Sequence, residues 1–160
     1  MAFDRVSHHL LIKKLKLMGV NPNLIYLLQN YLTGRKQIVV VDGVCSDPVP
    51  VTSGVIQGSI LGPLLFNIFV CDLPQCLEFA HCSMYADDSK IFLPVSNITD
   101  CFLLQRDLGN LERWCKQWKK ELNLEKCQCI TFTNKPSPIQ FHYHMGEVEI
   151  ERVSEIMTLA

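Results

Sequence analysis

The sequence has little charge and no excess of either sign. Charged residues make up 19% of the 160-residue chain, and its formal net charge at pH 7 is −1. A domain that binds nucleic acid unaided usually presents a basic face and has a high isoelectric point. The near-neutral balance excludes such a broad basic surface, so any contacts with phosphate groups are expected to be local or to come from other segments.

The eight cysteines lack the spacing of a zinc site or a disulfide framework. No C-x-x-C pair occurs, and Cys127 and Cys129 are separated by a single residue. A secretory leader is also lacking, and no apolar run is long enough and free enough of charge to cross a bilayer. We therefore expect reduced thiols in an intracellular protein without a membrane partner. The sequence indicates neither nucleus nor cytoplasm, and no oligomeric state.

Helical and extended patterns alternate along the chain, which predicts an α+β fold. Apolar residues recur at helical spacing in residues 10–18, 24–32, 64–72 and 104–122. The β-branched run Ile38–Val41 leads into Asp42-Gly43, a strong signal for a hairpin turn, with a return strand over residues 49–52. A period of two predicts a strand over residues 126–133, and two short strands are expected around Met145-Gly146.

Two adjacent aspartates, Asp87 and Asp88, interrupt an otherwise apolar stretch from Ser83 to Leu93. The pattern predicts two short strands joined by an acidic turn. Two carboxylates at one tip repel each other unless a cation lies between them, and Mg²⁺ prefers such oxygen ligands together with substrate phosphates. Taken alone, an Asp-Asp pair is more often a solvated turn, so a metal site there needs support from the rest of the chain.

Three glycines, Gly54, Gly58 and Gly62, lie within a short span of the chain. Such spacing is typical of backbone that must approach another group closely. Ser59 is positioned to cap a following helix, which is apolar nearly all round and is therefore expected to be buried.

Four motifs follow one another in order: Ala2-Phe3-Asp4, the segment Gly54–Phe66, Tyr85-Ala86-Asp87-Asp88 and the segment Leu122–Cys127. Together they resemble the reverse transcriptase domain of non-LTR (LINE-type) retrotransposons. A single Asp-Asp turn is weak support, whereas four motifs in register are specific. The resemblance covers essentially the whole chain. It implies a polymerase palm, in which a small antiparallel sheet with an acidic hairpin packs on helices, truncated at both ends.

The resemblance implies RNA-directed DNA synthesis by two-metal nucleotidyl transfer. Asp87 and Asp88 would be catalytic residues and ligands of two Mg²⁺ ions. Lys126 matches a catalytic residue that approaches the leaving phosphate as a proton donor. The implied partners are an RNA template, a DNA primer and deoxynucleoside triphosphates.

Four further residues match the family's nucleotide- and template-binding positions. Gln57 and Gly58 would lie against the incoming nucleotide and the template. Phe3 would be the gate whose ring clashes with a ribose 2′-hydroxyl, and Tyr85 would lie beside the primer terminus.

The chain also departs from the family pattern. The family's first catalytic aspartate lies four residues before the Ala of the Ala-Phe-Asp triplet, and Ala2 is the second residue here. Asp4 follows the gate residue and is not a substitute. Residues 1–160 are therefore expected to form a single partial palm domain, without the N-terminal part of the fingers and without the thumb, that is inactive alone. Two alternatives stay open: a non-catalytic retroelement remnant, and a nucleic-acid-binding module.

Overall fold

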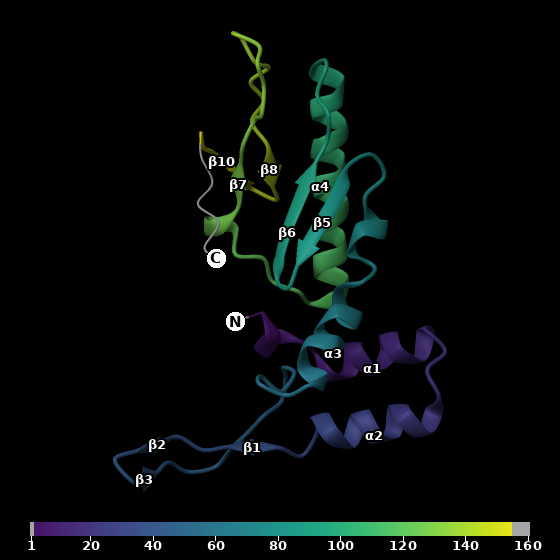
Figure 1. The fold of residues 1–160 in the computed structure, drawn as a ribbon, viewed down its shortest axis with the longest axis vertical. Coiled ribbons are helices and arrows are strands. Elements are labelled where there is room, and N and C mark those ends of the chain that lie inside the picture. Colours follow the sequence, from purple (N-terminus) through teal and green to yellow (C-terminus); the bar gives the residue numbers. More distant parts are fainter. Residues whose placement is uncertain (1, 155–160) are drawn as a thin grey trace. The chain divides into compact units, whose positions relative to one another are not determined.

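The computed structural model describes residues 2–154, which divide into two compact units. Unit 1 extends to Asp72 and also includes Tyr85–Asp88, whereas unit 2 comprises Leu73–Met84 and the residues from Ser89 onward. Figure 1 shows the helices and strands of both units coloured along the chain. The expectation of a single partial domain over residues 1–160 stays a prediction.

Unit 1 is built on three α-helices whose ends follow from the local sequence. They are α1 (His8–Leu17), α2 (Pro22–Leu32) and α3 (Leu61–Val70), preceded by the short 3₁₀ helix η1 (Phe3–Arg5). Gly19 has φ 73° and ends α1, since glycine adopts this left-handed backbone without strain. The Asn21 side chain accepts the backbone N–H of Asn23 at 2.9 Å and so caps α2.

The core of unit 1 forms where α1 contacts α2 and α3. The side chains buried there are large and aliphatic or aromatic: Leu11, Leu15, Leu28, Leu32, Leu65, Phe66 and Phe69. Burial of these apolar surfaces provides most of the free energy that holds the three helices together. The predicted burial of the helix after Ser59 is confirmed for one side of α3 only. On the other side, Leu64 is 54% exposed.

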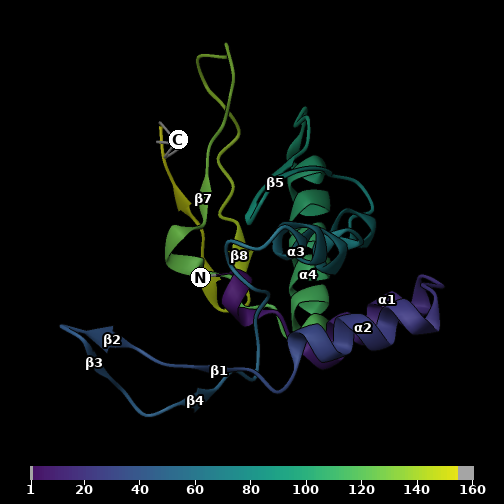
Figure 2. The same cartoon turned by 60° about the horizontal axis from the view of Figure 1, so that its bottom comes forward.

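A narrow antiparallel ribbon connects α2 to the glycine-rich segment. Strand β1 (Lys36–Gln37) pairs with β4 (Val49–Pro50), and β2 (Val40–Val41) pairs with β3 (Val44–Cys45). The predicted turn at Asp42-Gly43 is confirmed, with φ 50° and 81° at its two residues. Figures 1 and 2 show the ribbon as a long, thin projection.

Unit 2 is built around the long helix α4 (Ile98–Trp118). The other elements from Leu73 onward are short: η2 (Leu73–Cys76), β5 (His81–Tyr85), β6 (Asp88–Phe92), η3 (Leu124–Lys126), β7 (Gln128–Cys129), β8 (His144–Met145), β9 (Val148–Glu149) and β10 (Glu151–Arg152). Of these, β5 and β6 each have one residue, Tyr85 and Asp88, in unit 1. Trp114 and Trp118 of α4 are each 6% exposed and belong to the core. Among the described residues, no helix is long and apolar enough to cross a membrane.

The α+β class is confirmed, but the single antiparallel palm sheet is not observed. Within residues 2–154 each sheet has two strands, and the pair of β7 and β10 is parallel. The strand predicted over residues 126–133 is wrong for most of its length. Lys126 ends a 3₁₀ turn, and the Thr131 hydroxyl accepts a hydrogen bond from the Arg152 side chain in a segment outside any strand ladder.

Helix α4 begins at Ile98, before the apolar periodicity that predicts it starts at residue 104, and within residues 94–100, for which the sequence predicts a loop. The Asn97 side chain accepts the N–H groups of Thr99 and Asp100, while the Asp100 carboxylate accepts the N–H of Asn97. This reciprocal capping box satisfies N–H groups that the first turn of a helix leaves unpaired. It therefore starts the helix before the apolar periodicity becomes visible.

Lys14 is expected to hold α1 to the end of α3. Its side chain is 4% exposed, and its ammonium donates to the Phe69 carbonyl at 2.5 Å and to the Asp72 carboxylate at 2.6 Å. Lys14→Met is expected to lower the free energy of unfolding by about 3 kcal/mol in urea denaturation followed by circular dichroism, because it removes the buried ion pair with Asp72 and the hydrogen bond to the Phe69 carbonyl. Lys13→Met, at the neighbouring exposed position, is the control; an equal loss in both variants would contradict the assignment.

Candidate active site

The segment that contains Phe3 is joined to the glycine-rich segment by backbone hydrogen bonds within unit 1. The Gly54 N–H donates to the Val6 carbonyl at 2.8 Å, and the Val55 N–H donates to the Phe3 carbonyl at 2.9 Å. These two bonds fix the start of the glycine-rich segment against residues 3–6. Two of the four sequence motifs, distant along the chain, are thus in direct contact.

Gly54 is the residue that this contact requires. Its φ is +89°, and a Cβ built on it would lie 2.8 Å from Cα of Asp4. Two side chains close the junction: the Ser53 hydroxyl donates to the Asp4 carbonyl at 2.8 Å, and buried His8 donates from Nε2 to the Gly54 carbonyl at 2.7 Å. The prediction of close backbone approach in this glycine-rich segment is confirmed at Gly54.

Phe3, the predicted gate residue, is half-buried. Its ring stacks on the Phe66 ring of α3, with the centroids 4.4 Å apart and the planes inclined by 16°. This stacking holds one face of the Phe3 ring in a fixed position. The role of Phe3 as a gate against ribose stays a prediction.

Gln57 and Gly58 form an exposed turn that leads into α3. Gly58 has φ +78°, a backbone conformation that other residues adopt only with strain. The Ser59 hydroxyl donates to the Ile56 carbonyl at 2.7 Å and accepts the Gly62 N–H at 2.9 Å, so the predicted capping role of Ser59 is confirmed. The capped turn presents Gln57 and Gly58 at the surface of unit 1.

Strands β5 and β6 pair with each other and carry the two adjacent aspartates. Ala86 and Asp87 connect them, and a connection this short requires antiparallel strands. Ala86 has φ 51°, and Asp88 is the first residue of β6 rather than part of the turn. Tyr85 is 86% exposed, and both aspartates are exposed.

The tip of this hairpin, Tyr85–Asp88, belongs to the same compact unit as Phe3, Gln57 and Gly58. Lys126 differs, because it is an exposed residue at the end of η3 in unit 2. The structure thus groups six of the seven predicted site residues in unit 1. The site roles assigned to all seven stay predictions.

The carboxylate oxygens at the hairpin tip are the type of ligand that a hard cation prefers. Asp87 and Asp88 offer carboxylate oxygens at an exposed position, and Mg²⁺ is commonly bound by one or two carboxylates together with water and substrate phosphates. Within residues 2–154, however, no three His, Cys, Asp or Glu side chains are arranged to hold a metal ion. The described residues therefore offer two neighbouring carboxylates at this tip, but not a complete set of metal ligands.

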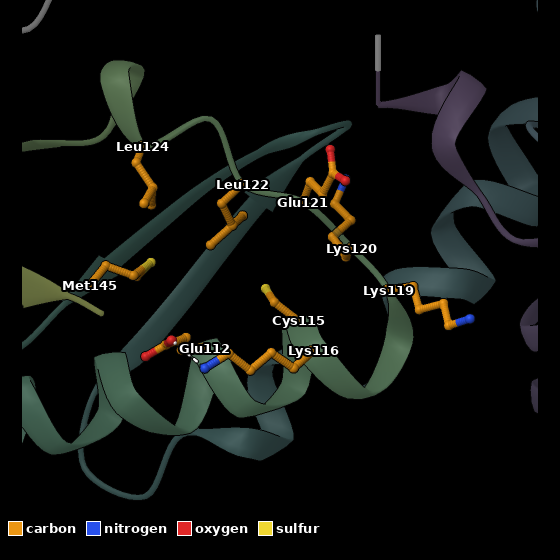
Figure 3. A pocket seen from close by; sticks show the side chains of 9 residues that line it. All are labelled: Glu112, Cys115, Lys116, Lys119, Lys120, Glu121, Leu122, Leu124 and Met145. Carbon is orange, nitrogen blue, oxygen red and sulfur yellow. Dashed lines mark ion pairs between the residues drawn. The ribbon is translucent and has the colours of Figure 1, made fainter. Parts of the chain in front are cut away.

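A pocket of about 500 Å³ lies in unit 2, between the last turns of α4 and the segment that follows it (Figure 3). Cys115, Leu122, Leu124 and Met145 give it an apolar lining, and Glu112 and Lys116 pair at its edge at 2.6 Å. Burial, with smaller contributions from neighbouring groups, raises the pKa of the Cys115 thiol to about 11. A thiol that stays protonated is a poor nucleophile, so Cys115 is not suited to nucleophilic attack in this pocket.

Comparison with known proteins gives the family. The family model described as "Reverse transcriptase (RNA-dependent DNA polymerase)" matches residues 1–149. The chain belongs to the reverse transcriptase family. The resemblance to the reverse transcriptase domain of non-LTR retrotransposons, drawn from four motifs, is confirmed.

The curated relatives are proteins of mobile elements. The chain is 34% identical over 142 residues to "RNA-directed DNA polymerase from mobile element jockey" of Drosophila melanogaster, covering 84% of this chain and 15% of that protein. It is 34% identical over 164 residues to "Probable RNA-directed DNA polymerase from transposon BS" of the same organism, covering 96% and 18%. The chain therefore spans less than a fifth of the length of these two relatives.

Two structurally important residues escaped the sequence analysis. His8 is buried against the Gly54 carbonyl. Asp107 of α4 is completely buried, and its carboxylate binds the backbone just before β5. Both are polar residues in otherwise ordinary helical segments, and their partners lie 27–46 residues away along the chain. No local pattern identifies such partners.

Gly54→Ala is expected to disrupt the junction between residues 3–6 and the glycine-rich segment. The positive φ alone costs about 1–3 kcal/mol for a residue with a Cβ, and the clash with Asp4 adds to that cost. We expect a lower urea midpoint for Gly54→Ala. Gly109→Ala in α4, where a Cβ meets nothing within 4 Å, serves as the control and is expected to raise stability. An unchanged urea midpoint in Gly54→Ala would show that the junction does not require glycine.

Proposed function

We propose that this chain is the palm part of an RNA-directed DNA polymerase. The observation that carries the proposal is the exposed Asp87-Asp88 tip, grouped with Phe3 and the Gln57-Gly58 turn in one unit of a reverse transcriptase family member. The substrates would be an RNA template, a DNA primer and deoxynucleoside triphosphates. The names of the relatives support the same reaction class.

In this proposal the hairpin tip binds the metal. Asp87 and Asp88 hold two Mg²⁺ ions with further oxygen ligands from substrate and water. Mg²⁺ held by these two carboxylates would supply activation of the primer 3′-hydroxyl and neutralisation of the charge on the leaving pyrophosphate. Because phosphoryl transfer depends mainly on positioning and charge stabilisation, the main task of these residues is to fix the geometry of the reacting groups.

The other proposed site residues select and orient the substrates. Phe3, held by its stack on Phe66, excludes a ribose 2′-hydroxyl. Gln57 and Gly58 contact the incoming nucleotide and template, and Tyr85 contacts the primer terminus. Lys126 donates a proton toward the leaving phosphate.

Metal binding at the hairpin tip can be tested directly. Addition of Mn²⁺, a paramagnetic substitute for Mg²⁺, is expected to broaden the NMR signals of the Asp87 and Asp88 amides. Asp87→Asn removes a charged ligand and is expected to weaken this effect at least tenfold. Asp42→Asn is the matched control, since Asp42, like Asp87, is an exposed aspartate in a tight turn between two strands. Equal broadening in both variants would exclude the proposed metal site.

Polymerase activity is expected to require a carboxylate beyond Asp87 and Asp88. In a primer-extension assay on an RNA template with Mg²⁺, we expect no product from residues 1–160 alone. A longer chain that supplies an upstream aspartate before Ala2 is expected to restore extension. Product from the 160-residue chain that persists in Asp42→Asn and disappears in Asp87→Asn would show that two carboxylates suffice.

A further inference from the structure

Helix α4 holds the entrance to the acidic hairpin through one buried carboxylate. Asp107 is completely buried and accepts the backbone N–H groups of Glu78, Phe79 and Ala80 at 2.8, 2.8 and 2.7 Å. The Asn110 side chain donates a fourth hydrogen bond to Asp107 at 3.2 Å. Since β5 begins at the next residue, this carboxylate fixes the backbone where the hairpin starts.

The exit from the hairpin is also held by a carboxylate of α4. After β6, the N–H groups of Ser96 and Asn97 donate to the Asp100 carboxylate at 2.7 and 3.1 Å. Asp100 and Asp107 are seven residues apart, which places them on the same face of a helix, two turns from each other. Helix α4 therefore binds the backbone immediately before β5 and the segment that leads from β6 into α4. Figures 1 and 2 both show β5 alongside α4.

The hairpin itself has little packing to hold its direction. Within β5 only Cys82 and Met84 are half-buried, and within β6 only Ile91. None of the strand residues is fully buried, so hydrophobic burial contributes less here than in the core. The hydrogen bonds at the two ends consequently have a large share in fixing the orientation of the strands.

Asp107 is suited to this task as an anion. Burial alone would raise the pKa of its carboxyl, but the hydrogen bonds from residues 78–80 and Asn110 lower it further than burial raises it. The net direction is a lowered pKa, so the carboxylate is ionised and can accept hydrogen bonds on both oxygens. An amide at this position would have to turn an NH₂ group toward one of the backbone N–H donors.

We propose that Asp107 is a positioning residue that sets the direction of the acidic hairpin and thereby the location of Asp87. This inference rests on the proposed function for its catalytic meaning. Seven residues separate Ala80 from Asp87, a length of roughly 20 Å in an extended strand. A tilt of about 5° at the base moves the tip by roughly 2 Å, and misplacement by about 1 Å can cost a factor of about 100 in rate.

Backbone hydrogen exchange of the 160-residue chain tests this proposal without metal or substrate. Asp107→Asn is expected to speed exchange about tenfold or more at the Phe79 and Ala80 amides and along β5 and β6. The amides of Leu111 and Cys115 in α4 report the general stability of unit 2 and are expected to change far less. Glu112→Gln, a half-buried carboxylate of the same helix that pairs with Lys116 and not with the hairpin backbone, is the control and is expected to leave hairpin exchange unchanged.

The outcomes separate the possibilities. Equal acceleration in α4 and in the hairpin would mean that Asp107 only stabilises unit 2, and unchanged hairpin exchange would overturn the proposal outright. If Asp107→Asn does not fold, Asn110→Ala replaces it, with about threefold faster exchange expected in the hairpin alone. The Mn²⁺ titration of Asp87→Asn judges the metal site separately, so failure of the proposed function leaves the exchange result interpretable.

Discussion

The structure of unit 1 depends on a short backbone contact between residues 3–6 and Gly54-Val55. The two hydrogen bonds from Gly54 and Val55 join parts of the chain that are about fifty residues apart in sequence. Closing such a loop has an entropic cost, which the buried helix core must offset. The contact also determines where the Gln57-Gly58 turn begins. Backbone hydrogen bonds, and not side-chain contacts, therefore position this part of the candidate site.

The hairpin tip presents the opposite situation. Its two aspartates are exposed and bring like charges together, an arrangement that stabilises nothing by itself. Groups of this kind are retained at functional sites, where a bound cation or substrate changes the balance. At the base of the hairpin, by contrast, the backbone of residues 78–80 is fixed by hydrogen bonds to the Asp107 carboxylate of α4.

Local signals predicted much of the fold. Gly19, the Asn21-Pro22 pair and Asp42-Gly43 each determine backbone geometry within a few residues. The structure has helix ends at the first two and the predicted turn at the third. The family followed from four motifs in order. The pairing of strands could not be predicted in this way, because it depends on contacts between segments that are distant in sequence, such as β7 and β10. Lys126 ends a 3₁₀ turn although the alternating pattern around it suggests a strand. Asp107 shows the same limit for side chains, since its donors lie 27–29 residues away.

The ribbon between α2 and the glycine-rich segment has a practical consequence. Ile38, Val39, Val40 and Val41 are each more than half exposed, although they are four consecutive β-branched residues. Such a strand readily adds to the edge of another copy of itself. Exposure of these four side chains therefore favours self-association of the purified polypeptide, and Val40→Lys is expected to reduce it.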